Sequence, residues 1–101
     1  VYVYDTGPGL RESWGRAVVE AMLTGLPVLI PADRRHHLHE LVPHGVAGFH
    51  CTTRADWEQA MHCLTDPKTR ERMGRAAADY ARRVLCNAEE HRAAWRAALA
   101  P

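Results

Sequence analysis

The sequence predicts an α/β fold with about three parallel strands, flanking helices and a helical C-terminal tail. Three short apolar runs, at residues 1–4, 27–31 and 46–51, alternate with helical patterns in the first half of the chain. Beyond residue 52 the apolar residues recur only at helical spacing. Strands that alternate with helices imply a parallel sheet whose crossovers are right-handed.

Each predicted strand is a short apolar run bounded by residues that break regular structure. Residues 1–4 are β-branched or aromatic, which favours a buried or half-buried strand, and the Gly-Pro-Gly at residues 7–9 ends it. Residues 27–31 form a continuous apolar run between two prolines, which is typical of a parallel strand buried on both faces. Residues 46–51 are the third predicted strand, with Gly48 in it or at its edge.

The first helix is predicted from residue 14 onwards. Apolar residues recur there at the i, i+3, i+4, i+7 and i+8 positions of an amphipathic helix. Ser13 is the expected N-cap and Gly25 the expected left-handed C-cap. A short helix follows around residues 38–42, and Gly45 ends it. The apolar face of the first helix comprises Trp14, Ala17, Val18, Ala21 and Met22.

Three more helices are predicted after the last strand, each with a capping residue and an apolar face. Trp57 and Trp95 lie on such faces and are expected in the core. The expected caps are Thr53 supported by Asp56, Asp66 followed by Pro67, and Asn87 with Glu90 at the third helical position. The other residues expected to be buried are Ala60, Met61, Leu64, Met73, Ala76, Ala77, Tyr80, Ala81, Val84 and Leu99.

The composition is that of an ordinary globular domain and argues against several classes of protein. The 101 residues suit one small domain, and 47% hydrophobic with 25% charged residues is the usual globular range. A net charge of +1 is far from that of a nucleic-acid-binding domain. Three Cys without a C-x-x-C pair argue against a disulfide framework and fit a reducing cytosol. No apolar run approaches the about 18 residues that a bilayer span needs.

Two carboxylates mark the candidate site. Glu12 lies at the junction of a loop and a helix, and Glu20 lies further along that helix. On one helix they would be about 12 Å apart along the axis, whereas the paired carboxylates of glycoside hydrolases lie about 5–10 Å apart. Two glutamates on a surface helix are more often simply solvated. They could instead touch two parts of one long ligand, with an anionic group bound at the helix start, outside the carboxyl ends of the strands.

The segment from Glu12 to Pro27 resembles the Glu-x7-Glu motif of GT-B retaining glycosyltransferases, commonly written E-G-F-G-x4-E-A-M-A-x-G-x-P-V. Residues 40–42 and 45–48 similarly resemble the family's E-I-V-x-D-G-x-T-G block. The resemblance covers nearly the whole chain and implies half of a Rossmann-like GT-B C-terminal domain. The residues in register with the first motif are Glu12, Gly15, Glu20, Ala21, Met22, Gly25, Pro27 and Val28.

The resemblance also implies a reaction and the residues that carry it. The parent enzyme would transfer a sugar from a UDP, GDP or ADP sugar to a hydroxyl of a sugar or lipid-linked acceptor, with retention. Glu12 is the implied catalytic residue and contacts the donor sugar, while Glu20 accepts hydrogen bonds from the ribose hydroxyls. Backbone N–H groups of Ser13, Trp14 and Gly15 bind the sugar or diphosphate, and a glycine at position 15 lets the backbone approach the ligand closely. No cofactor and no nucleic-acid partner is expected.

Residues 1–101 are expected to be a single partial domain of a longer chain. The family's domain begins with three further strands, and this sequence starts inside a strand-like run without an initiator Met. The isolated 101 residues are therefore expected to be inactive. We expect the parent in the cytoplasm, either free or peripheral to a membrane.

The loop of residues 31–39 departs from the family pattern, because it is rich in Arg and His and lacks the family's Gly-Gly. One alternative is that Arg34 or Arg35 contacts a phosphate of the donor or the acceptor, and the sequence leaves it open. No metal site is expected, because the histidines at 36, 37 and 39 lack the i, i+4 spacing that places two imidazoles on one helix face. Ser13-Trp14 also replaces the family's Gly-Phe.

Two other classes of function remain as alternatives. The first is a non-catalytic Rossmann-like interaction module, for which a homodimer through the exposed sheet edge at residues 1–4 is expected. The second is another α/β nucleotide binder such as a Rossmann dehydrogenase half. It is disfavoured because no G-x-G-x-x-G follows a strand.

Overall fold

The computed structural model describes residues 1–4, 15–33 and 37–100. Its centre is a three-stranded parallel sheet in the order β1 (Tyr2–Val3), β2 (Val28–Pro31) and β3 (Gly48–Cys51). Tyr2 is paired with Val28, and Val28 in turn with Gly48. The predicted class, a parallel α/β fold with flanking helices and a helical tail, is confirmed.

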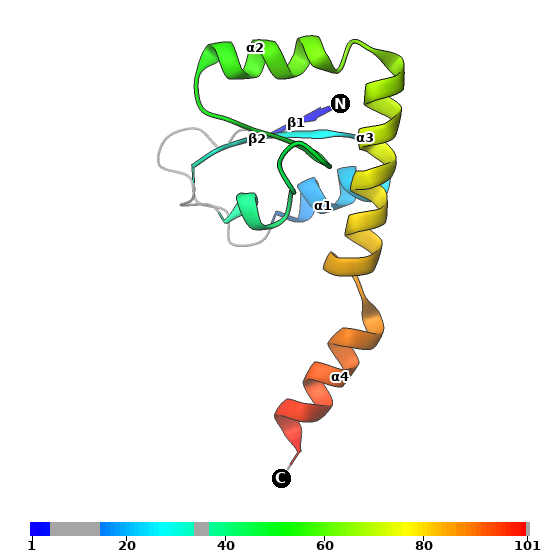
Figure 1. The fold of residues 1–101 in the computed structure, drawn as a ribbon. Coiled ribbons are helices and arrows are strands. Elements are labelled where there is room, and N and C mark those ends of the chain that lie inside the picture. The colour runs from blue at the N-terminus through cyan, green and yellow to red at the C-terminus, as the bar shows by residue number, and fades with distance from the viewer. Residues whose placement is uncertain (5–14, 34–36, 101) are drawn as a thin grey trace.

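Helices cover both faces of the sheet (Figure 1). One face carries α1 (Arg16–Leu23) and the 3-10 turn η2 (Leu38–Glu40), and the other carries α2 (Arg54–Cys63). The long helix α3 (Pro67–Tyr80) runs past the side of the sheet and continues into a π-helical turn, η3 (Ala81–Leu85). The last helix, α4 (Ala88–Leu99), extends away from this body (Figure 1).

The central strand β2 is buried on both faces, as its uninterrupted apolar run predicts. Val28, Leu29 and Ile30 have no exposed surface. Because side chains alternate along a strand, Val28 and Ile30 pack into the cluster beneath α1, whereas Leu29 packs with α2. One short run of sequence therefore supplies two hydrophobic cores.

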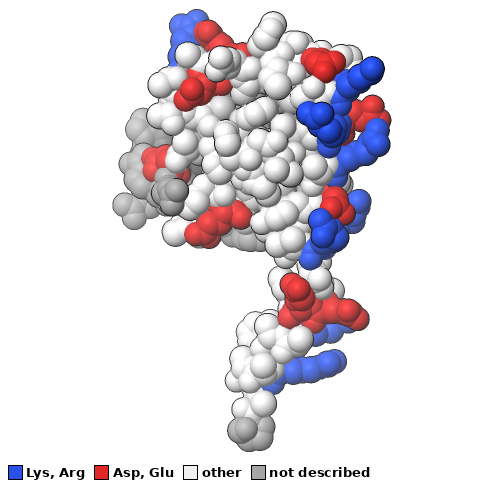
Figure 2. All heavy atoms as spheres, in the orientation of Figure 1, with Lys and Arg blue, Asp and Glu red and all other residues white. Residues whose placement is uncertain are grey.

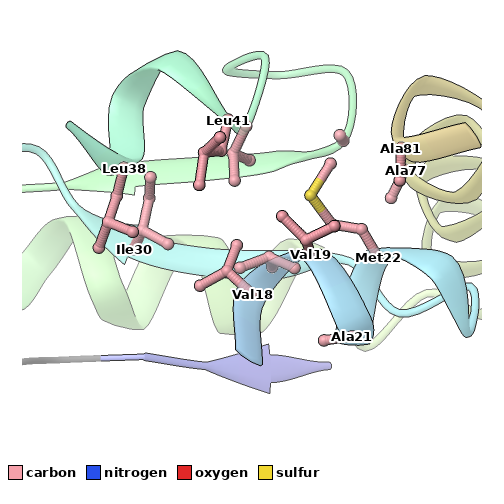
Figure 3. Close-up of a cluster of buried hydrophobic side chains, with 12 residues drawn as sticks. Val18, Val19, Ala21, Met22, Ile30, Leu38, Leu41, Ala77 and Ala81 are labelled. Carbon is pink, nitrogen blue, oxygen red and sulfur yellow. The ribbon is translucent and has the colours of Figure 1, made fainter. Parts of the chain in front are cut away.

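The larger core lies between α1, η2, the sheet and α3 (Figure 3). Val18 and Met22 of α1 are fully buried and point towards the sheet and η2. The predicted face of α1 needs one correction. Ala17 is exposed, and Val19, at 4% exposure, is buried in its place. The helix is turned slightly because it packs against η2 and α3 as well as against the sheet.

A pair of glycines joins α1 to α3. Gly25, at φ +84°, ends α1 in the left-handed conformation that the sequence predicts. Its N–H donates to the Met22 carbonyl at 3.0 Å, and the Leu26 N–H donates to the Ala21 carbonyl at 3.2 Å, which is a Schellman motif. A Cβ on Gly74 of α3 would lie 2.2 Å from the Gly25 carbonyl oxygen, so α3 can pack on this turn only with glycine there.

The three later caps are confirmed, and the first is wrong. Thr53 and Asp56 form a reciprocal capping box, and the side chains of Asp66 and Asn87 each accept a backbone N–H at the start of their helices. In α1, however, the N-cap is Gly15, without a side-chain hydrogen bond, and not Ser13, which itself lies outside the described residues. Serine is a favoured N-cap residue, but α1 begins at Arg16, two residues after the start that the periodicity predicts.

Burial in the C-terminal half differs most from the prediction. Trp95 is 67% exposed and Leu99 76% exposed, and no residue of α4 is buried. Met61 and Val84, each 46% exposed, also lie outside the core, and Trp57 is only partly buried. Periodicity identifies the apolar face of a helix, but it does not show whether another element covers that face.

Candidate functional site

The carboxyl ends of the strands, where open α/β sheets bind ligands, gather several loops. The residues that follow β2 and β3 meet there and line a cavity of about 240 Å³. The start of α1 adjoins the turn η2, on the face of the sheet opposite α2. The cavity is lined by Pro31, Ala32, Asp33, Cys51 and Thr52.

Gly15, at the start of α1, is buried for a reason that the sequence did not show. A Cβ at this position would lie 2.6 Å from Cδ2 of Leu38 and 3.0 Å from Cδ1 of Leu41. Both leucines belong to the hydrophobic core (Figure 3). The small residue predicted to admit a ligand therefore also allows η2 to pack closely against α1, and a larger residue would have to displace the ends of these two leucine side chains.

Glu20 lies on the surface of α1. Its Oε1 accepts a hydrogen bond from Arg16 Nε at 2.9 Å, and its side chain is 61% exposed. An exposed i, i+4 pair of this kind contributes only about 0.3–0.5 kcal/mol. The carboxylate can therefore exchange Arg16 for a ligand hydroxyl at little cost. The structure places Gly15 and Glu20 at the start and on the body of one helix.

Several predicted site residues lie outside the described part of the chain. These are the implied catalytic residue Glu12, the donor-binding residues Ser13 and Trp14, and Arg34, Arg35 and His36 of the basic loop. Their expected roles stay predictions.

A cluster that the sequence did not single out lies on η2. Nδ1 of His37 is 3.6 Å from Glu40 Oε1, and Nε2 of His39 is 3.8 Å from the same oxygen. The two rings are stacked with their centroids 6.3 Å apart. Nδ1 of His39 is buried and has no hydrogen-bond partner among the described residues. The signal in the sequence is the i, i+3 spacing of His37 and Glu40, which places both on one side of a helical turn.

A second histidine pair, His44 and His50, lies at β3. Nδ1 of His44 accepts the backbone N–H of His50 at 2.9 Å, and Nε2 of His50 donates to the Val42 carbonyl at 2.6 Å. These rings line one wall of a cavity of about 400 Å³ together with Cys51 and Asp56. Burial, and then the charge of Asp56, raises the pKa of the Cys51 thiol, so this cysteine is not an activated nucleophile.

The described residues contain neither a group of metal ligands nor a membrane-spanning helix. Within residues 1–4, 15–33 and 37–100, no three His, Cys, Asp or Glu side chains are grouped so that they could hold a metal ion. Over the same described ranges, none of the helices has the length and apolar character that crossing a bilayer requires.

The parallel sheet, its covering helices and the loops at its carboxyl ends define a Rossmann-like half of a GT-B domain. The chain belongs to the group 1 glycosyltransferases, because residues 6–80 match the family described as "Glycosyl transferases group 1". The matched residues include the predicted Glu-x7-Glu segment and η2, and they end before η3 and α4.

One curated relative is D-inositol 3-phosphate glycosyltransferase from Pseudarthrobacter chlorophenolicus, which is 42% identical over 77 residues. The aligned part covers 70% of this chain but only 17% of the relative. No solved structure matches the chain at a significant level.

Proposed function

We propose that this chain is the donor-binding half of the C-terminal domain of a retaining GT-B glycosyltransferase. The observation that carries the proposal is the family match over residues 6–80, which includes both motif glutamates. The name of the relative, a glycosyltransferase acting on D-inositol 3-phosphate, supports sugar transfer to a hydroxyl-bearing acceptor. Residues 1–101 would be a single partial domain, and the rest of the protein would complete the donor site and bind the acceptor.

Each part of the donor would have a place on α1. The free N–H groups and dipole of the helix start favour the diphosphate. Glu12 would contact the transferred sugar, and Glu20 would leave Arg16 to accept hydrogen bonds from the ribose hydroxyls. Ser13, Trp14 and Gly15 would supply backbone donors. Catalysis would come from positioning and from stabilising charge on the leaving diphosphate, so no cofactor is assigned.

The test uses the full-length protein. Turnover of UDP, GDP and ADP sugars is measured for the wild type and for Glu12→Gln and Glu20→Gln. Loss of a hydrogen bond between a carboxylate and a hydroxyl predicts at least about a tenfold fall in kcat/KM for one donor. The anomeric configuration of the product, read by NMR, tests retention.

The chain offers a matched control in α2. Arg54 Nε donates to Glu58 Oε1 at 2.7 Å, which repeats the Arg16–Glu20 arrangement outside the candidate site. Glu58→Gln is therefore expected to leave turnover unchanged. A wild-type protein that neither turns over nor binds any nucleotide sugar would contradict the proposal.

The open side of the sheet supports a second candidate, a non-catalytic interaction or dimerisation module. Val3 is 47% exposed, and in the described part of the chain β1 pairs with β2 alone. Val3 also lines an apolar cavity of about 500 Å³ with Trp57 and Met61 of α2. A homodimer through this edge would show as a doubled mass in light scattering, and a monomer at high concentration would count against it.

A further inference from the structure

The cluster of His37, His39 and Glu40 on η2 has the form of a small polar binding site. Both imidazoles approach the same oxygen of Glu40, at 3.6 Å and 3.8 Å. These distances exceed those of a direct hydrogen bond. The carboxylate therefore lies between two rings without being satisfied by either of them, and 64% of the Glu40 side chain is open to solvent.

The backbone under this cluster is strained. His37 has φ +56°, and it is the one residue other than glycine with a positive φ in the described part of the chain. A left-handed residue with a Cβ is energetically unfavourable and persists where its surroundings hold it there. The His37 side chain is 66% exposed, so burial of the imidazole does not account for this conformation. Residues held in this way are concentrated at ligand sites.

Packing holds the cluster beside the proposed donor site. Leu38 is fully buried, and its Cδ2 occupies the space that a Cβ of Gly15 would need. Leu38 and Leu41 both point into the core from η2 (Figure 3). The turn is thereby anchored against Gly15 at the start of α1, which is one of the residues proposed to bind the donor.

The chemistry of the cluster suits hydroxyl groups better than phosphates. A carboxylate only accepts hydrogen bonds, whereas a neutral imidazole offers one donor and one acceptor. A sugar hydroxyl can donate to Glu40 and either donate to or accept from the imidazoles. A diphosphate would be repelled by the Glu40 charge, since like charges at this range disfavour binding.

We propose that Glu40, with His37 and His39, forms a subsite for the hydroxyls of a neutral sugar carried by the donor. This inference rests on the proposed function, and it assigns to η2 the transferred sugar rather than the nucleotide. Because the subsite contains a carboxylate, it should discriminate against donors whose sugar is itself a carboxylate, such as a uronic acid.

The experiment compares two ligands on the full-length protein by calorimetry. One is the nucleotide sugar that the wild type binds best, and the other is the corresponding nucleoside diphosphate without the sugar. Glu40→Gln is expected to weaken binding of the nucleotide sugar at least about tenfold, because it loses charge-assisted hydrogen bonds. It is expected to leave binding of the nucleoside diphosphate unchanged. Glu58→Gln is the control and should change neither.

A pair of variants tests the same subsite without adding backbone strain. Glycine and asparagine both accept a left-handed conformation, so His37→Gly and His37→Asn should both fold. His37→Gly removes the hydrogen-bonding side chain, so it should weaken binding of the nucleotide sugar but not of the nucleoside diphosphate. His37→Asn keeps a donor and an acceptor, so it should bind the nucleotide sugar more tightly than His37→Gly does.

The outcomes separate this inference from the function on which it rests. If Glu40→Gln weakens binding of both ligands equally, or weakens binding of neither, the sugar subsite is wrong while the proposed function stands. A uronosyl donor bound as tightly as its neutral counterpart would also overturn it. A wild-type protein that binds neither ligand would overturn the proposed function and the subsite together.

Discussion

Helices α1 and α4 both have an apolar face with helical spacing, but only one of these faces is covered. In α1, Val18 and Met22 are fully buried between the sheet, η2 and α3. In α4, Trp95 and Leu99 are 67% and 76% exposed. In Figure 2 one side of α4 is free of charged atoms along most of its length. The comparison shows that an apolar stripe stabilises a fold only where other elements cover it.

The two helices also differ in their relation to the family. The match to the group 1 glycosyltransferases includes all of α1 and ends at residue 80, before α4 begins. His91, Ala94, Trp95 and Ala98 line a shallow apolar depression of about 390 Å³ on α4. The body of the fold therefore follows the family, whereas α4 lies outside the match, follows the π-helical turn η3 and begins after its cap Asn87.

The largest expected effect is the truncation of Met22, which lies in the covered stripe of α1. Met22→Ala should lower the free energy of unfolding by about 2–5 kcal/mol, because it removes buried methylenes and leaves a cavity. Urea denaturation followed by circular dichroism measures this. A change below about 1 kcal/mol would mean that α1 is not packed as described.

Substitution of Gly74 in α3 tests the contact that links α3 to α1. Gly74→Ala should improve the helix propensity by about 1 kcal/mol, yet it places a Cβ against the Gly25 carbonyl oxygen. We expect a net loss of about 1–3 kcal/mol from this forced displacement. Arg72→Ala on the same helix is the control, since Arg72 is exposed. A stabilised Gly74→Ala variant would contradict the close contact.

The capping box of α2 predicts a dependence of stability on pH. Backbone N–H groups of Thr53 and Thr52 hold the pKa of the Asp56 carboxyl below its usual value. A lowered pKa in the folded state stabilises the fold above the unfolded pKa of about 3.9, and this stabilisation is lost as the pH falls through the folded value. Asp56→Asn should therefore be less stable than the wild type at neutral pH. The difference should narrow below about pH 4, measured as melting temperature across pH.

The smallest expected effect belongs to the uncovered stripe of α4. Leu99→Ala should change the free energy of unfolding by no more than about 0.5 kcal/mol, because the side chain is already in water. Urea denaturation of the Leu99→Ala and Met22→Ala variants under the same conditions compares their free energies of unfolding directly. A loss of more than about 2 kcal/mol would show that α4 is covered in solution, by another part of the protein or by another chain.

The elements that were predicted well depend on neighbours in sequence. The uninterrupted apolar run of β2, the left-handed Gly25, and the caps at Thr53, Asp66 and Asn87 all follow from residues within a few positions of each other. Local sterics and hydrogen bonds decide such features, so the sequence predicts them without knowledge of the fold.

Two residues of the predicted site, Gly15 and Glu20, lie in the described part of the chain, and their roles stay predictions. The family resemblance pointed to Gly15 and Glu20, and the structure places both on α1. The cluster of His37, His39 and Glu40 was missed because the histidines were assigned to the Arg- and His-rich loop, whereas Glu40 was considered only as part of the short helix and of the family's second sequence block. Their convergence depends on the left-handed backbone at His37, a conformation that is uncommon in residues other than glycine and that the sequence pattern did not indicate.

The sequence by itself determined the order of strands and helices along the chain and the caps of the three later helices, because these depend on side-chain periodicity and local capping. The tertiary structure alone decided which of those faces became a core. It turned α1 to bury Val19 instead of Ala17, required glycine at position 74, and left Trp95 in solvent. Burial is a property of two surfaces in contact, and a single segment of sequence describes only one of them.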